Sequence, residues 1–166
     1  MARVNLELQP HQLLAQWKRC GMTADWLASY LSCELAAEAR AAATNVLSTV
    51  INELLENAVK FSSDAAASIR VAVERQGASV RIETWNRALE GRASLLEETL
   101  AELQRGSAQA LFLKRTAHPA AAGGPGIGII IMQRDHGACI QASVANIEAG
   151  TADVHVRADL GLLCVG

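Results

Sequence analysis

Hydrophobic residues recur along the chain with two periods, and the switches between them predict an ordered series of strands and helices. Alternation with period two is typical of strands, and spacings of three to four are typical of helices. The predicted strands cover residues 4–9, 69–73, 80–84, 139–147 and 152–158. The predicted helices cover residues 11–20, 23–32, 34–61, 92–105, 107–116 and 127–136, with Gly21 separating the first two.

The longest predicted helix, over residues 34–61, carries the strongest signal. It is rich in Ala, Leu and Glu and contains neither Gly nor Pro. Val46, Val50 and Leu54 belong to an apolar stripe that continues to Val59. A stripe of this kind is suited to packing on a sheet.

The order of the elements indicates the fold class. Two predicted hairpins, around Gln76-Gly77 and over residues 148–151, each require antiparallel neighbours. We therefore expect a single α+β domain over residues 1–166, a two-layer α/β sandwich. Its sheet should be mixed but mostly antiparallel, with the helices on one face.

Composition and charge narrow the function classes. The formal net charge of the 166-residue chain is −2, which argues against broad electrostatic binding to nucleic acid or to an anionic membrane. No apolar run approaches the roughly 20 residues that a membrane span needs. We expect a cytoplasmic protein.

One set of polar residues in the long helix could carry chemistry. Glu53 and Asn57 are four residues apart and share one face of the helix. An amide oxygen of Asn57 could bind Mg²⁺, and Glu53 could polarise a hydroxyl beside it. Lys60 could reach a phosphate. The alternative is that these residues form the solvated polar edge of an amphipathic helix.

A glycine-rich segment precedes the helix predicted over residues 127–136. Gly124, Gly126 and Gly128 lie in the run Gly123-Gly124-Pro125-Gly126-Ile127-Gly128. Glycines allow a backbone to approach a phosphate closely, and a helix N-terminus offers free N–H groups to an anion. No Gly-Lys-Ser/Thr follows, so the segment is not a Walker A loop. The alternative is a flexible surface loop.

Together the two segments resemble known motifs. Residues 53–61 resemble the N-box of the GHKL superfamily, and residues 124–128 resemble its G2 box. The likeness covers roughly residues 45–158 and implies a Bergerat fold that binds ATP and Mg²⁺. It implies that Asn57 binds the metal and that Glu53 is the catalytic base. It also implies that Gly124, Gly126 and Gly128 wrap the phosphates, beneath a lid between about Leu89 and Gly123.

The adenine-binding motif of the superfamily, Asp-x-Gly-x-Gly, is altered here. Counting alternate residues along the strand over 80–84 brings Asn86 to the Asp position, and Ala88 and Glu90 to the glycine positions. Asn can still accept a hydrogen bond from the adenine amino group, but it lacks the negative charge. Asn86 is therefore the candidate residue for the base.

A stand-alone domain with an initial strand is similar to the anti-sigma-factor serine kinases. Residues 17–21 and 24–28, together with the altered adenine motif, look more like the SiaB-type relatives of those kinases. The resemblance implies a small regulatory protein partner, either an antagonist of the anti-sigma class or a sigma factor. It also implies a possible homodimer through the N-terminal strand or helices.

Three functions remain open. The first is a regulatory serine/threonine protein kinase that phosphorylates a small antagonist protein. The second is a degenerate GHKL module that binds a partner protein without kinase activity, a reading that Asn86, Ala88 and Glu90 motivate. The third, an ATP hydrolase that switches a partner without phosphorylating it, would use the same residues as the kinase.

Overall fold

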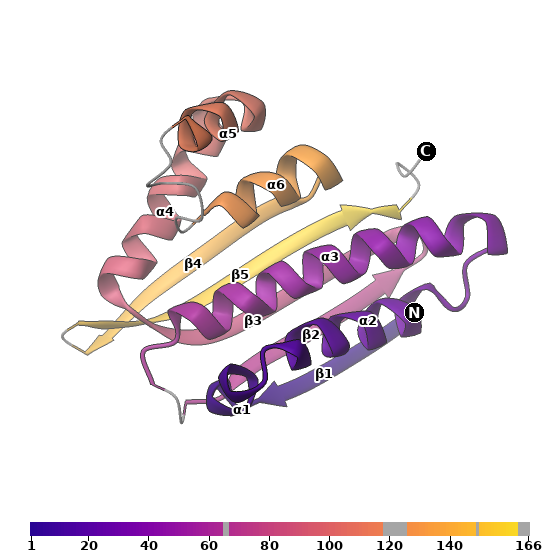
Figure 1. Cartoon of the computed structure of the whole chain (residues 1–166), viewed down its shortest axis with the longest axis horizontal. Coiled ribbons are helices and arrows are strands. Elements are labelled where there is room, and N and C mark those ends of the chain that lie inside the picture. The colour runs from indigo at the N-terminus through magenta and orange to yellow at the C-terminus, as the bar shows by residue number, and fades with distance from the viewer. Residues whose placement is uncertain (65–66, 118–125, 149, 163–166) are drawn as a thin grey trace.

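The computed structural model describes residues 1–64, 67–117, 126–148 and 150–162, and its elements are shown in Figure 1. Its sheet has the strand order β1-β2-β3-β5-β4, and each neighbouring pair is antiparallel. The strands are β1 (Ala2–Leu8), β2 (Ile69–Gln76), β3 (Ser79–Leu89), β4 (Cys139–Glu148) and β5 (Thr151–Gly161). The helices are α1 (Pro10–Ala15), α2 (Lys18–Ser32), α3 (Ala37–Phe61), α4 (Glu90–Arg105), α5 (Ala108–Thr116) and α6 (Ile127–His136).

Helices α1, α2, α3 and α6 lie on the same face of the sheet, while α4 and α5 lie beside β4 (Figure 1). Alternate residues of β3 and β5 are buried under the helices, and the residues between them are more exposed. The predicted fold class, an α+β two-layer sandwich with helices on one face, is confirmed. The pairings of the described strands are all antiparallel. None of the described helices combines the length and the apolar character that crossing a membrane would need.

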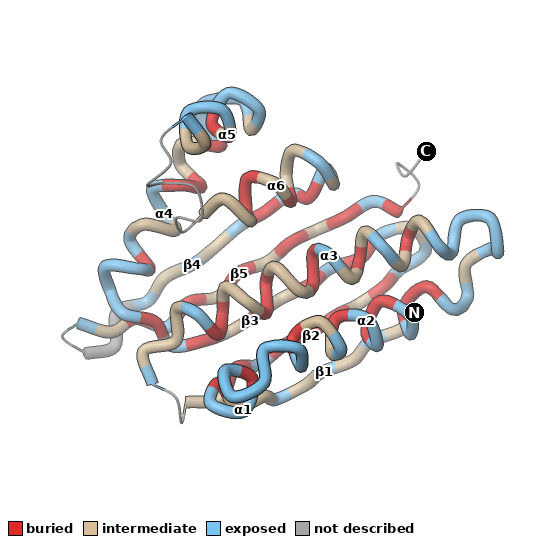
Figure 2. The backbone as a smooth tube through the Cα atoms, viewed as in Figure 1, coloured by how far each residue is buried: buried red, intermediate tan, exposed pale blue. Residues whose placement is uncertain are grey.

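Helix α3 is the central element of the helix layer and runs along β3, with α2 and α6 beside it (Figure 2). Its inward side contains no charged residue and carries much of the core. These buried residues are Ala43, Leu47, Val50, Ile51, Leu54, Leu55, Ala58 and Val59. The apolar stripe predicted for this helix is therefore confirmed, with the helix beginning at Ala37 rather than at residue 34.

The break between the first two helices does not lie at the predicted residue. Gly21 lies inside α2, and the chain leaves the helical conformation at Gln16 instead. A glycine inside a helix costs about 1 kcal/mol relative to alanine. Here burial of Cys20, Ala24 and Leu27 outweighs that cost. Packing against α3 therefore overrides the local propensity.

The two predicted hairpins are present. Gly77 and Gly150 have φ angles of 59° and 88°, which favour glycine at these turns. Strand β3 continues to Leu89, past the predicted end at residue 84, and its alternation places Asn86 and Ala88 on the buried side. The predicted loop over residues 117–126 falls mostly outside the described residues.

Candidate functional site

The first turn of α6 lies directly against one flank of α3. A Cβ atom placed on Gly128 would overlap the Glu53 carboxylate and would lie 3.7 Å from Nδ2 of Asn57. Only glycine leaves room for this approach while Glu53 keeps its position. The structure thus brings together three residues that the sequence placed in separate motifs, Glu53 and Asn57 in one and Gly128 in the other.

Gly126 sets the position of this turn from the other side. It is the N-cap of α6 and has a φ angle of 100°, a backbone conformation that L side chains rarely adopt. A Cβ on Gly126 would lie 2.8 Å from Oγ1 of Thr99, which is buried on α4. Gly126 and Gly128 therefore lie between α3 and α4. Gly124, the third predicted glycine, lies outside the described residues.

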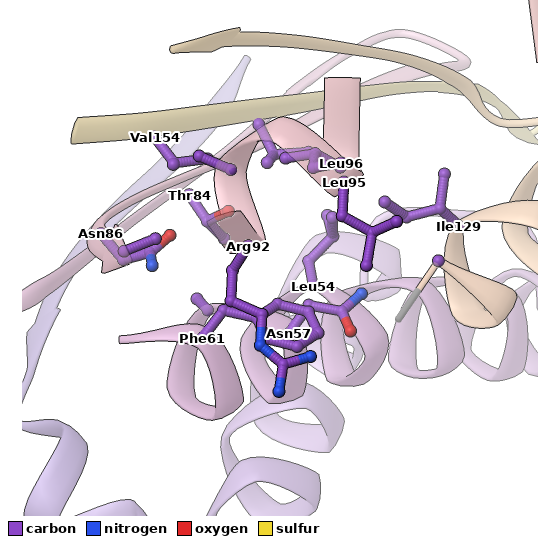
Figure 3. A pocket seen from close by; sticks show the side chains of 15 residues that line it. Leu54, Asn57, Phe61, Thr84, Asn86, Arg92, Leu95, Leu96, Ile129 and Val154 are labelled. Carbon is purple, nitrogen blue, oxygen red and sulfur yellow. The ribbon is translucent and has the colours of Figure 1, made fainter. Parts of the chain in front are cut away.

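A cavity opens beside these residues, between α3, β3 and α4 (Figure 3). Its wall is mainly apolar, with Leu54 and Phe61 from α3 and Leu96 from α4. Asn57 and Asn86 bring amide groups to it from α3 and β3, respectively. The volume is about 40 Å³, which suits a few water molecules.

Helix α4 closes this cavity. The Arg92 guanidinium lies 5.6 Å from the centre of the Phe61 ring, and Figure 3 shows both side chains at the mouth beside Asn57. The α4 residues Ala93, Leu95 and Leu96 add apolar contacts. Sequence reasoning missed Arg92 and Thr99, because no motif marks them and their roles depend on where α4 packs. Phe61 ends the segment that resembles the N-box, but no role at the cavity was predicted for it.

The electrostatics of Glu53 differ from those of its neighbour Glu56. Burial, and then the negative charge of Glu56, raise the pKa of Glu53, although Lys60 acts in the opposite direction. Burial also acts to raise the pKa of Glu56, but hydrogen bonds from Lys60, Asn52 and Trp17 outweigh it and lower that pKa. Glu53 therefore holds a proton more readily than an ordinary glutamate, and Glu56 less readily.

Lys60 lies on the other flank of α3. Its Nζ atom is 2.9 Å from Oε2 of Glu56 and 5.3 Å from the centre of the Trp17 ring. It does not line the cavity that contains Asn57 and Asn86. The structure therefore separates Lys60 from the other predicted residues.

Two of the three adenine-motif positions, Asn86 and Ala88, line the cavity, and Glu90 does not. Asn86 lines the cavity and is 7% exposed, Ala88 is buried below it, and Glu90 is the first residue of α4. No side chain or backbone group among the described residues hydrogen-bonds to the Asn86 amide. Trp85 points to the face of the sheet without helices, where it stacks on His155 with ring centres 4.6 Å apart.

The residues at the two ends of the site differ in how well they fit MgATP. At one end, the free backbone N–H groups at the start of α6 suit a phosphate. The Asn57 amide beside Gly128 suits Mg²⁺, whose charge would offset the repulsion between the phosphate and the Glu53 carboxylate. At the other end, a cavity of about 40 Å³ is too small for a purine ring. The base would fit beside Asn86 only after α4 moves away from β3.

Comparison with known proteins identifies a solved structure with a similar fold. No protein family and no curated protein matches the chain by sequence. Among solved structures, the chain is similar to a chain of the SiaB–SiaC complex from Pseudomonas aeruginosa, with a TM-score of 0.68 and 16% sequence identity. The match covers 96% of this chain and 90% of that one. This fold is therefore shared with a member of a two-protein complex.

Proposed function

We propose that this protein is an ATP-binding regulatory kinase that transfers a phosphoryl group to a serine or threonine of a small partner protein. The observation that carries the proposal is the meeting of Gly128 with Glu53 and Asn57. The GHKL-like motifs around these residues support it. The shared fold with a chain of the SiaB–SiaC complex supports a protein partner.

Each residue would have a distinct role. The amide oxygen of Asn57 would be a ligand for Mg²⁺, and backbone N–H groups following Gly126 would bind phosphate oxygens. MgATP supplies the phosphoryl group when bound. The Glu53 carboxylate would accept the proton of the acceptor hydroxyl. Its raised pKa moves in the direction that general-base catalysis near neutral pH favours.

Asn86 would select the base. Its amide oxygen can accept a hydrogen bond from an adenine amino group, in an otherwise apolar cavity. Because α4 fills the space, nucleotide binding would have to displace it. A displaced α4 would change the surface offered to a partner, which links nucleotide binding to partner binding.

A second candidate is a partner-binding module without kinase activity. Two observations favour it: the cavity is narrow, and Ala88 occupies one position where the resembled motif has glycine. In that case α4 would stay closed, and partner binding would not depend on nucleotide.

Calorimetric titration with MgATP separates the two candidates. The kinase predicts micromolar binding that falls at least tenfold in Asn57→Ala, since the loss of a single hydrogen-bonding or metal-binding group costs about 1.4 kcal/mol or more. The matched control is Asn45→Ala, an exposed asparagine on the same helix. Equal loss in both variants, or no heat from a folded protein at millimolar ATP, would contradict the kinase.

A transfer assay then separates the kinase from an ATP hydrolase. The protein is incubated with ATP labelled at the γ-phosphate and with a candidate small partner protein. Label on the acceptor supports the kinase. Release of labelled phosphate without transfer supports the hydrolase.

A further inference from the structure

Arg92 differs from the other residues around the cavity between α3, β3 and α4. Among the described residues that line this cavity, Arg92 is the only one with a charge. Its side chain is exposed and lies at the mouth beside Asn57 (Figure 3). Neither an ion pair nor a hydrogen bond joins its guanidinium to another described residue. The N–H groups of Arg92 therefore keep their capacity to bind an anion.

The phosphate end of the candidate site needs a cation. ATP brings several negative charges, Mg²⁺ offsets part of them, and the Glu53 carboxylate lies beside the same end. The predicted cation is Lys60, but the structure pairs it with Glu56 at 2.9 Å and places it over the Trp17 ring. Among the described residues that line the cavity, Arg92 is left as the cation for this role.

The Phe61 ring holds the guanidinium near the polar residues of α3. The guanidinium carbon of Arg92 lies 5.6 Å from the centre of the ring, within the range in which a cation is attracted to an aromatic face. Phe61 is four residues after Asn57, so the two lie one turn apart on the same side of α3. A planar guanidinium can donate two hydrogen bonds to one phosphate group, which suits this position.

The first turn of α4 is fixed to the sheet. Helix α4 begins directly after β3, and the N–H of Glu90 donates a hydrogen bond to the carbonyl of Gly150 at 3.0 Å. If α4 rotates about this end to admit a base, each residue moves in proportion to its distance along the helix, which rises about 1.5 Å per residue. Leu95 and Leu96 in the second turn would therefore move farther from the cavity than Arg92 in the first turn.

We infer that Arg92 binds the phosphates of the nucleotide, in the role predicted for Lys60. The inference rests on the proposed function and adds to it a residue that recognises the charge of the ligand. Arg92 stays at the mouth while the apolar part of α4 makes room for the base. The helix that closes the cavity thus also contributes a contact to the bound nucleotide.

Calorimetric titration with MgATP compares Arg92→Ala with Lys60→Ala, the matched control. Arg92→Ala should bind MgATP at least tenfold more weakly than the wild type, because charge-assisted hydrogen bonds to phosphate are lost. Lys60→Ala should change the affinity by less than about threefold, because an exposed charge away from the ligand is screened by solvent and salt. Urea unfolding verifies that both variants are folded. A larger loss in Lys60→Ala than in Arg92→Ala would overturn the inference.

The sign of the Arg92→Ala effect distinguishes ligand binding from closure of the mouth. If Arg92 only covered the mouth, its removal would open the cavity and raise the affinity for MgATP, which would overturn the inference. Arg92→Lys keeps the charge without the planar guanidinium and should recover part of the lost affinity. The difference between wild type and Arg92→Ala should shrink in about 1 M NaCl, because salt screens the contact with phosphate. A difference that does not depend on salt would also overturn the inference.

The same titrations distinguish failure of this inference from failure of the proposed function. If the wild type and Arg92→Ala bind MgATP equally well, the role of Arg92 is overturned and the proposed function stands. If the folded wild type gives no heat at millimolar MgATP, both are overturned.

Discussion

The two flanks of the C-terminal half of α3 contain similar polar residues but use them differently. On the flank toward α2, Glu56 accepts hydrogen bonds from Asn52 and Lys60, each at 2.9 Å. On the flank toward α6, Glu53 and Asn57 have no side-chain hydrogen bond to any described residue. Both flanks are partly buried, so exposure to solvent does not explain the difference.

The difference indicates which flank can bind something else. Hydrogen-bonding groups that pair with each other, as the Glu56 carboxylate does with Asn52 and Lys60, contribute to stability and have little capacity left for a ligand. On this flank the Oδ1 atom of Asn52 is buried without a partner among the described residues. Glu53 and Asn57 keep that capacity and lie beside the N-terminus of α6. Desolvation without a partner costs stability, and groups kept in this state are typical of functional sites.

The largest expected effect on stability is that of Gly126→Ala, which alters the segment that holds the α6 flank in place. A residue with a side chain at positive φ costs about 1–2 kcal/mol. The new Cβ would also lie 2.8–2.9 Å from atoms of Thr99, which is fully buried and cannot move away freely. We expect the free energy of unfolding in urea to fall by about 2–4 kcal/mol.

Gly77→Ala is the control for this prediction. Gly77 also has a positive φ, 59°, but a Cβ there would meet nothing within 4 Å. It should lose only the backbone contribution, about 1–2 kcal/mol. Equal losses for both variants would mean that Gly126 is not packed against α4 in solution.

A smaller effect, with opposite signs on the two flanks, is expected for Glu56→Gln and Glu53→Gln. Glu56→Gln weakens charge-assisted hydrogen bonds, and because Lys60 is half exposed the loss at pH 7 should be about 1 kcal/mol. Glu53→Gln removes a charge that burial disfavours, so this variant should be more stable than the wild type at pH 7.

The pH dependence of the free energy of unfolding distinguishes the hydrogen bonds lost in Glu56→Gln from the buried charge removed in Glu53→Gln. The folded pKa of Glu56 is lowered, so its contribution to stability is present above the ordinary value of 4.5 and is lost as the pH falls through the folded pKa. The folded pKa of Glu53 is raised, so the gain of Glu53→Gln should appear as the pH rises through that pKa and vanish below 4.5. Urea unfolding at pH 7 and at acid pH measures both. If both substitutions change the free energy of unfolding in the same direction, the two glutamates do not differ in solution in the way proposed.

Much of the fold could be predicted from periodicity, because the core depends on it directly. The apolar stripe of α3 and the alternation that places Asn86 on the buried side of β3 follow from spacing alone. The helix boundary near Gly21 could not be predicted, since tertiary packing of α2 on α3 decides it.

The candidate site could be predicted only in part, for a physical reason. Spacing on one helix put Glu53 near Asn57, but the contact with Gly128 joins segments about 75 residues apart in the sequence. The position of Lys60 depends on which anionic group it binds, the predicted phosphate or a carboxylate of the same helix. Glu56 lies four residues before it on the helix, the spacing of a stabilising ion pair. The closure of the cavity by Arg92 depends on the packing of α4, which has no local signal.

The smallest expected effect on stability, from Gly128→Ala, is the sharpest test of the α6 flank. Position 128 is helical, so alanine gains up to about 1 kcal/mol in helix propensity. The new Cβ would displace the Glu53 carboxylate, which is the flexible end of its side chain and can move at little cost. We expect the free energy of unfolding to change by less than about 0.5 kcal/mol, because these two effects oppose each other.

Phosphoryl transfer by Gly128→Ala should nevertheless fall by about 100-fold, the smaller end of what a general base contributes. Gly91→Ala in α4, where a Cβ meets nothing within 4 Å, should leave transfer unchanged. Full activity in Gly128→Ala would show that the Glu53 carboxylate need not occupy this position, and the role of catalytic base would then have to pass to another residue.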